Sequence, residues 1–137
     1  MRFVVLVKAN DAIEAGVLPT PEDFTKMNAF NQDLVKAGIM LAGEGLQPSS
    51  KGARLTFRGG NATVTDGPFA ETKELVAGFW IVQGTSKEEI VERFKHAPME
   101  DGQTLEIRPI YEAEDFGDNL PPEVRADEER RRSEISQ

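Results

Sequence analysis

Two short runs that are apolar at every position constrain the fold of this chain most. They are Phe3-Val4-Val5-Leu6-Val7 near the start and Gly78-Phe79-Trp80-Ile81-Val82 further along. Successive side chains of a β-strand point to opposite faces. A strand without alternation is therefore apolar on both faces, which is typical of a central, fully buried strand. We expect a sheet with two apolar faces, both of which have to be covered.

Two segments carry the residues that begin helices. Thr20-Pro21-Glu22-Asp23 combines an N-cap threonine, a proline at the first helical position and two first-turn acids, and it predicts a helix to about Ala37, ended by Gly38. Ser86-Lys87-Glu88-Glu89 matches a capping box and opens a second helix, ended at His96-Ala97-Pro98. The side chains expected to face inward are Phe24, Met27, Leu34 and Val35 in the first helix and Ile90, Val91 and Phe94 in the second.

The remaining strands complete an α+β pattern. Residues 39–46 and 104–111 read as single strands, and Ala53–Arg58 alternates in polarity and returns through Gly59-Gly60-Asn61 as a hairpin. One hairpin face is expected to be wet, with Arg54 and Arg58 on it. The order strand, helix, strand, hairpin, strand, helix, strand resembles a ferredoxin-like arrangement with an inserted β-hairpin.

The faces of the sheet predict the assembly. Two helices cover one face, and the chain has no third layer for the other. A second copy's sheet is the simplest cover, because soluble monomers seldom expose a large apolar patch. We therefore expect a homodimer in which the sheets pack face to face in a barrel-like core.

Composition excludes several classes of function. The 137 residues suit one domain, and the absence of cysteine excludes disulfides, thiolate metal sites and cysteine nucleophiles. His96 is the only histidine, so a usual zinc site is excluded too. A net charge of −8 without a basic stripe predicts no nucleic-acid partner. No run suits a signal peptide or a membrane span, so we expect a cytoplasmic protein without a membrane partner.

The C-terminal stretch differs from the body. Residues 112–137 hold nine acids and four arginines, a net −5, and Pro121-Pro122 breaks regular structure. We expect a domain over residues 1–111 and a charged tail over residues 112–137 that is extended or partly helical, lying on a partner or disordered.

The densest group of polar side chains is Asp66-Gly67-Pro68-Phe69-Ala70-Glu71-Thr72-Lys73-Glu74, between the hairpin and the second apolar strand. Asp-Gly-Pro ends the strand in a defined direction, and Phe69 is expected to fix the loop against the body. One interpretation is a rigid, solvated turn with a local ion pair. The other is a preorganised polar cluster at the mouth of a pocket between the first helix, the sheet and this loop.

Two further polar residues fall on buried elements. Asn31 lies on the apolar stripe of the first helix and is either bonded to nearby backbone or lines a pocket. Glu44 stands between two glycines, on the face expected for Met40 and Ala42, and is either in a salt bridge or lines a cavity.

The nine-residue run reads DGPFAETKE and resembles the signature of the DGPFAETKE family of YciI-like (YCII-related) proteins. Gly43-Glu44-Gly45-Leu46, Phe30-Asn31 and Arg108-Pro109 also resemble that family's pattern. The resemblance implies a dimeric α+β barrel of ferredoxin-like units. Many members of the family are encoded beside extracytoplasmic-function sigma factors, which implies a regulatory role. Some relatives are proposed to use a His–Asp pair, but Met27 and Asn28 occupy the corresponding stretch here.

Three hypotheses follow. The first is a site for a small polar or anionic molecule, with acid–base chemistry by Glu44 or Asp66 and no metal or cofactor. Its candidate ligand-binding residues are Asn31, Glu44, Asp66, Glu71, Lys73 and Arg108. The second is a dimeric interaction or regulatory protein that uses its tail. The third is a structural loop that clamps the dimer or the hairpin.

Overall fold

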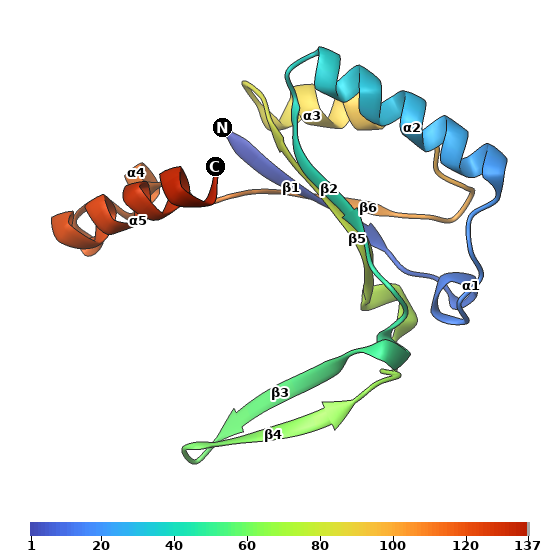
Figure 1. Ribbon diagram of the computed structural model, residues 1–137, viewed down its shortest axis with the longest axis horizontal. Helices are drawn as coiled ribbons and strands as arrows, with labels where there is room; N and C mark the ends of the chain where they lie inside the picture. The colour runs from blue at the N-terminus through green and yellow to red at the C-terminus, as the bar shows by residue number, and fades with distance from the viewer. Residues whose placement is uncertain (137) are drawn as a thin grey trace.

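The two runs of continuous apolar sequence form the two middle strands of an antiparallel sheet with strand order β2-β5-β1-β6. A computed structural model describes residues 1–136 (Figure 1). The strands are β1 (Arg2–Lys8), β2 (Met40–Gly45), β3 (Ala53–Arg58), β4 (Asn61–Asp66), β5 (Val76–Gln83) and β6 (Leu105–Pro109). The helices are α1 (Asp11–Glu14), α2 (Pro21–Lys36), α3 (Lys87–Phe94), α4 (Ala113–Phe116) and α5 (Pro122–Ile135), with short 3-10 helices η1 (Ser49–Lys51), η2 (Thr72–Glu74) and η3 (Gly117–Asn119).

The succession β1-α2-β2-β5-α3-β6, with its strand order, is that of a ferredoxin-like α+β fold, as the sequence predicts. Helices α2 and α3 lie on one face of the sheet (Figure 1). Val5 pairs with Trp80 and Phe3 with Val82, so these buried side chains share that face. They meet Phe30, Leu34, Ile90 and Phe94 of the two helices in a single hydrophobic core.

Both helix starts follow from their caps. Thr20 Oγ1 accepts a hydrogen bond from Asp23 N, and Asp23 Oδ2 accepts one from Thr20 N, which completes a capping box. Ser86 Oγ caps α3 by accepting from Glu89 N. The second capping box is only half formed, because the Glu89 carboxylate binds the backbone and hydroxyl of Thr85 instead of Ser86 N.

The predicted apolar stripe of α2 is wrong in two positions. Phe24 and Val35 are each 61% exposed, whereas Phe30 and Leu34 are buried and Met27 packs against them. An α-helix turns by about 100° per residue, so Val35 points well away from Leu34. The helix faces the sheet along Met27, Phe30 and Leu34.

Within a single chain, the expectation that only one hairpin face is wet is also wrong. Gly59 and Gly60 form the turn with positive φ values of 58° and 81°, as a two-residue hairpin requires. However, β3 and β4 form a sheet of their own, and every residue of both strands is exposed. Figure 1 shows the hairpin projecting away from the four-stranded sheet, so neither face packs on the body.

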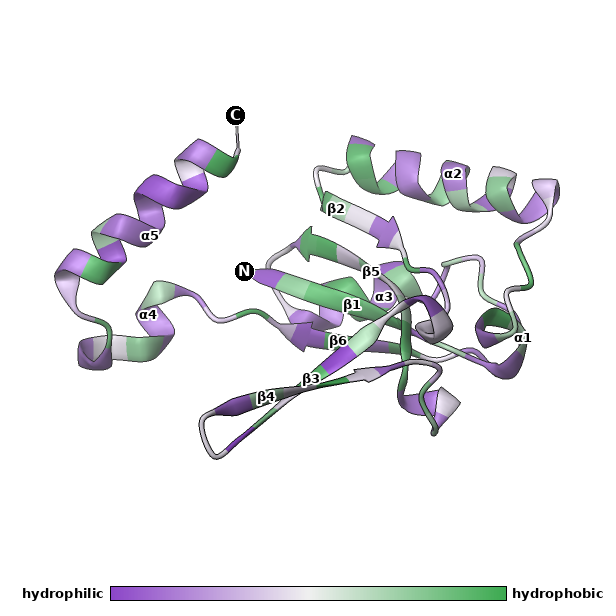
Figure 2. Ribbon diagram, turned by 60° about the horizontal axis from the view of Figure 1, so that its bottom comes forward, coloured by the Kyte–Doolittle hydropathy of each residue, from purple (hydrophilic) through white to green (hydrophobic). Residues whose placement is uncertain are grey.

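The tail is helical and tied to the first strand. Arg2 Nε donates to Glu112 Oε1 at 2.9 Å, and Arg132 lies 3.7 Å from the other oxygen of the same carboxylate. The hydrogen bond from Arg2 lowers the pKa of Glu112. In Figures 1 and 2, the tail and the hairpin extend from the sheet on the side that α2 and α3 leave uncovered.

That uncovered side has an apolar centre. Val4 pairs with Ile81 and Leu6 with Phe79, and these four side chains point opposite to the core residues and are half-buried. We call Val4, Leu6, Phe79 and Ile81 the open face. In the part of the chain that the structure describes, no helix covers it (Figure 1).

Candidate functional site

The Asp66–Glu74 loop is held against the turn formed by η1. Gly67 N donates to Gly52 O at 3.0 Å, and Phe69 N donates to Ser49 Oγ at 3.1 Å. A Cβ atom on Gly67 would stand 1.8 Å from the backbone oxygen of Ser49. The loop therefore needs glycine at this position, because the two backbone segments approach too closely for any side chain.

Glu14 of α1 anchors this contact. Its carboxylate accepts hydrogen bonds from Ser49 N at 3.0 Å and from Ser49 Oγ. Both bonds lower the pKa of Glu14. The chain Phe69 N–H, Ser49 hydroxyl and Glu14 carboxylate thus joins the loop, η1 and α1. Sequence reasoning missed Glu14 and Ser49, since an acid in a short helical turn and a serine 35 residues later carry no shared local pattern.

Phe69 docks the loop on the base of the hairpin, where the Arg54 guanidinium lies 3.9 Å from the centre of its ring. This geometry is a cation–π contact. Phe69 itself is half-buried. Arg54, which the sequence places on the wet face of the hairpin, thus contributes to the attachment of the loop.

A cavity of about 280 Å³ adjoins the loop at the end of β1. It is lined by Lys8, Ala9, Asn10, Asp11, Lys73, Gly102 and Thr104. Backbone hydrogen bonds hold its walls together, from Lys8 N to Thr104 O at 3.0 Å and from Ala9 N to Leu75 O at 2.9 Å. The Asn10 side chain caps α1 by accepting from Ile13 N. We call this the lysine cavity, because Lys8 and Lys73 outnumber the single carboxylate of Asp11.

Of the candidate residues from the sequence, Lys73 alone lines this cavity. Asp66 and Glu71 belong to the same loop and are exposed, and Glu71 has a left-handed backbone conformation with φ of 61°. The loop therefore holds three of the candidate residues, of which Lys73 borders the lysine cavity.

Glu44 and Arg108 lie on the uncovered side of the sheet but far from each other. Glu44 pairs with Phe79 and Arg108 with Val4, so both project beside the open face. They belong to the two edge strands, and three strand spacings of about 4.8 Å separate them by at least about 14 Å. Glu44 shares its face with Ala42, as expected, but not with Met40, because a β-bulge between Met40 and Ala42 turns Met40 into the core.

Asn31 faces the helix-covered side. Its Oδ1 accepts a hydrogen bond from Trp80 Nε1 at 2.9 Å. The partner is a side chain and not the backbone group considered in the sequence analysis. This bond satisfies the indole N–H of a buried tryptophan.

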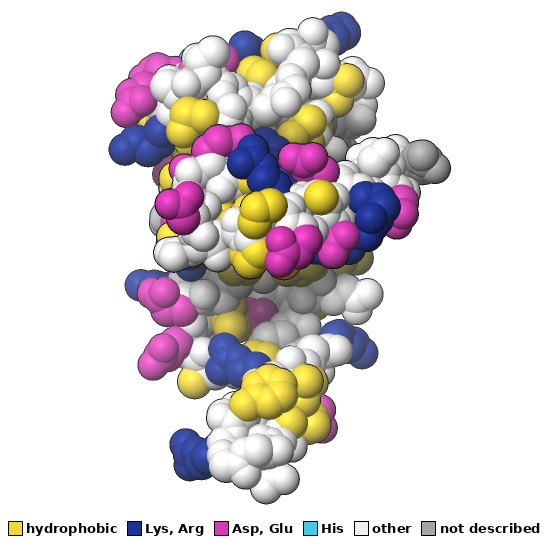
Figure 3. Space-filling model, turned by 90° about the vertical axis from the view of Figure 1, so that its left-hand side faces the viewer, with side chains coloured by type: hydrophobic (Ala, Val, Ile, Leu, Met, Phe, Trp, Pro, Cys, Tyr) yellow, Lys and Arg dark blue, Asp and Glu magenta, His cyan; other side chains and the backbone are white. Residues whose placement is uncertain are grey.

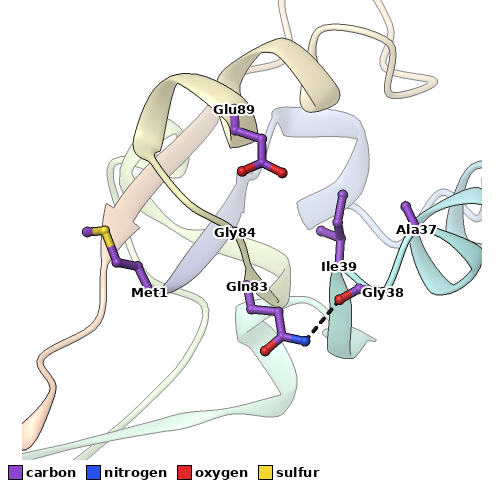
Figure 4. A pocket seen from close by; sticks show the side chains of 7 residues that line it. All are labelled: Met1, Ala37, Gly38, Ile39, Gln83, Gly84 and Glu89. Atoms are coloured by element: carbon purple, nitrogen blue, oxygen red, sulfur yellow. Dashed lines mark hydrogen bonds between the residues drawn. The ribbon is translucent and has the colours of Figure 1, made fainter.

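A second cavity, of about 270 Å³, lies between α2, the end of β5 and α3, and Figure 4 shows its lining. Its polar groups are largely engaged, since Gln83 Nε2 donates to Gly38 O and the Glu89 carboxylate binds Thr85. Those bonds from Thr85 lower the pKa of Glu89. No cationic side chain lines this cavity within residues 1–136, and none of the six candidate ligand-binding residues does.

Residues 1–136 contain neither a candidate metal site nor a candidate membrane span. No group of three or more histidine, aspartate or glutamate side chains is placed to hold a metal ion. None of the helices in this range has both the length and the apolar character needed to cross a membrane.

Comparison with known families decides where the chain belongs. The model of the YCII-related domain matches residues 1–114. The chain belongs to the YCII-related domain family. An uncharacterised protein from Rhizobium meliloti (strain 1021) is 31% identical over 86 residues, which are 61% of this chain and 69% of that protein. The YCII-related domain includes the whole sheet, the hairpin and the lysine cavity, and α5 begins at Pro122, after the match ends.

Proposed function

We propose that this YCII-related protein binds a small polar or anionic molecule in the lysine cavity beside the Asp66–Glu74 loop. The observation that carries the proposal is the position of Lys73. This residue is in the loop and lines the cavity together with Lys8. An ammonium group is a strong donor to carboxylate or phosphate oxygens.

The two lysines would have different roles. The Lys8 side chain is 17% exposed and lies 3.6 Å from a carboxylate oxygen of Glu106. Lys8 is thus held in place and partly neutralised. Lys73 is exposed, so its ammonium group is free to turn towards an anion. Asp11 on the cavity wall would disfavour a highly charged anion and favour one that also offers a hydrogen-bond donor.

We expect a bound anion to stabilise the protein in a thermal-shift screen against inorganic phosphate and small mono- and dicarboxylates. A ligand at a hundred times its Kd adds about 2.7 kcal/mol to the free energy of unfolding. The stabilisation should be lost in Lys73→Ala and kept in Lys51→Ala, a matched variant at an exposed lysine outside the cavity.

Equal stabilisation of Lys73→Ala and the unmodified protein would contradict the proposed site. An absence of stabilisation by every anion of the panel would contradict an anion site altogether.

The second candidate function is that of a dimeric interaction or regulatory protein, and the uncovered open face favours it. Four apolar side chains at the centre of a sheet need a cover, and a second copy's open face is apolar over the same area. A sigma factor, implied by the resemblance, would be the regulatory partner in this reading. The dimer also bears on acid–base chemistry, because a partner over the open face would shield Glu44 from water.

We expect light scattering to give twice the chain mass of 15.1 kDa. Phe79→Lys should give a monomer, because it places a charge in the centre of the open face. Val35→Lys is the control, since Val35 is an exposed apolar residue of α2 on the other side of the sheet. A monomer without any substitution, or a dimer that Phe79→Lys leaves intact, would contradict this arrangement.

A further inference from the structure

The β3–β4 hairpin exposes an apolar face that the described chain does not cover. Leu55 pairs with Val64 and Phe57 with Ala62, so these side chains share one face. Leu55, Phe57 and Val64 are 58%, 77% and 61% exposed. A two-stranded hairpin alone in water is marginally stable at best. This hairpin therefore needs a surface to pack against.

A second uncovered apolar group lies at the start of the tail. Tyr111 and Phe116 stack with their ring centres 4.7 Å apart, and they are 68% and 41% exposed. We call residues 111–118 the tail elbow. It contains four acids, Glu112, Glu114, Asp115 and Asp118, and no basic residue. Glu112 pairs with Arg2 and Arg132, and Glu114 with Arg125, so within residues 1–136 Asp115 and Asp118 carry the uncompensated charge. The hairpin has the opposite balance, since Arg54 and Arg58 oppose only Asp66 at its base.

The two groups lie at opposite margins of the open face. In Figure 1 the hairpin leaves the sheet below and the tail leaves it to the left. Figure 3 shows the tail and the hairpin separated by a hollow, with hydrophobic side chains on the hairpin. Two open faces can face each other only across a two-fold axis that runs parallel to the sheets. The parallel axis at right angles to the line between the hairpin and the tail exchanges these two margins. In a dimer built on that axis, the tail of one copy comes to the side on which the other copy's hairpin projects.

We propose that each hairpin packs against the tail elbow of the second copy. Leu55, Phe57 and Val64 would cover the partner's Tyr111 and the partner's Phe116. Two such contacts, related by the two-fold axis, would stabilise the dimer at two margins of the facing sheets. This inference rests on the homodimer proposed above and adds to it which elements of one copy hold the other.

The experiment uses the absence of cysteine from the chain. Full-length chains carrying Phe57→Cys and Phe116→Cys, with tags of different size, are co-expressed, purified together and oxidised. We expect a covalent heterodimer on a non-reducing gel that disappears on reduction. Phe57→Cys co-expressed with Phe24→Cys is the control, because Phe24 is more exposed than Phe116, at 61% against 41%, but lies on α2. That pair should cross-link at least tenfold less.

Light scattering of the same samples separates the outcomes. A dimer in which the Phe57–Phe116 pair cross-links no more than the Phe24 control would contradict the contact between hairpin and tail elbow. It would not contradict the face-to-face packing of the sheets. A monomer would overturn both. A dimer with the selective heterodimer band supports both.

Discussion

Phe94→Ala is expected to lower the free energy of unfolding by about 3–5 kcal/mol. Phe94 is 4% exposed, and its ring meets Phe30 and Trp80 edge to face with centres 5.3 Å and 5.1 Å apart. The substitution would leave a cavity between α2, α3 and the sheet. Ile90 and Phe94 are the two buried residues of α3, so the helix would also lose one of its two anchors in the core.

Urea denaturation at one fixed protein concentration measures this effect, since the stability of a dimer depends on concentration. The control is Phe24→Ala, which removes the same ring from a site that is 61% exposed. We expect this control to change the stability by no more than about 0.5 kcal/mol. Equal losses of unfolding free energy from the two substitutions would show that the cluster of Phe30, Trp80 and Phe94 is not the centre of the core.

Gly67→Ala is expected to release the Asp66–Glu74 loop from η1 and to cost about 1–3 kcal/mol, as overpacking does. The new Cβ would meet the Ser49 backbone oxygen at 1.8 Å, and a backbone atom cannot move aside as a flexible side chain can. The hydrogen bonds of Gly67 N and Phe69 N would break with this displacement. Because the same loop carries Lys73, anion binding in the lysine cavity should weaken as well.

Amide hydrogen exchange at Phe69 and anion-induced thermal shifts measure the two consequences. Gly45→Ala is the control, since a Cβ at Gly45 meets no atom within 4 Å. It should leave Phe69 protected. If Gly67→Ala kept the protection of Phe69, the loop would not depend on this close approach.

Sequence reasoning succeeded where a property belongs to one segment. The apolar runs at residues 3–7 and 78–82 are central strands because a strand that lacks alternation has no face to offer to water. Thr20 and Ser86 begin helices because their hydroxyls accept from backbone N–H groups three residues on. It failed at Phe24 and Val35, since the periodicity of a helix defines a stripe only to within a residue and the sheet selects which stripe is buried.

The sequence by itself determined the strands, helices α2 and α3 and their order, because caps, turn glycines and apolar runs act over a few residues. A resemblance over a short run of residues indicated the family. Only the tertiary structure decided which side chains meet. Glu14 reaches Ser49 across 35 residues, and the strand order places Glu44 and Arg108 on opposite edges of one sheet. Such pairings depend on strand register and on the path of the chain between elements, which no local pattern encodes.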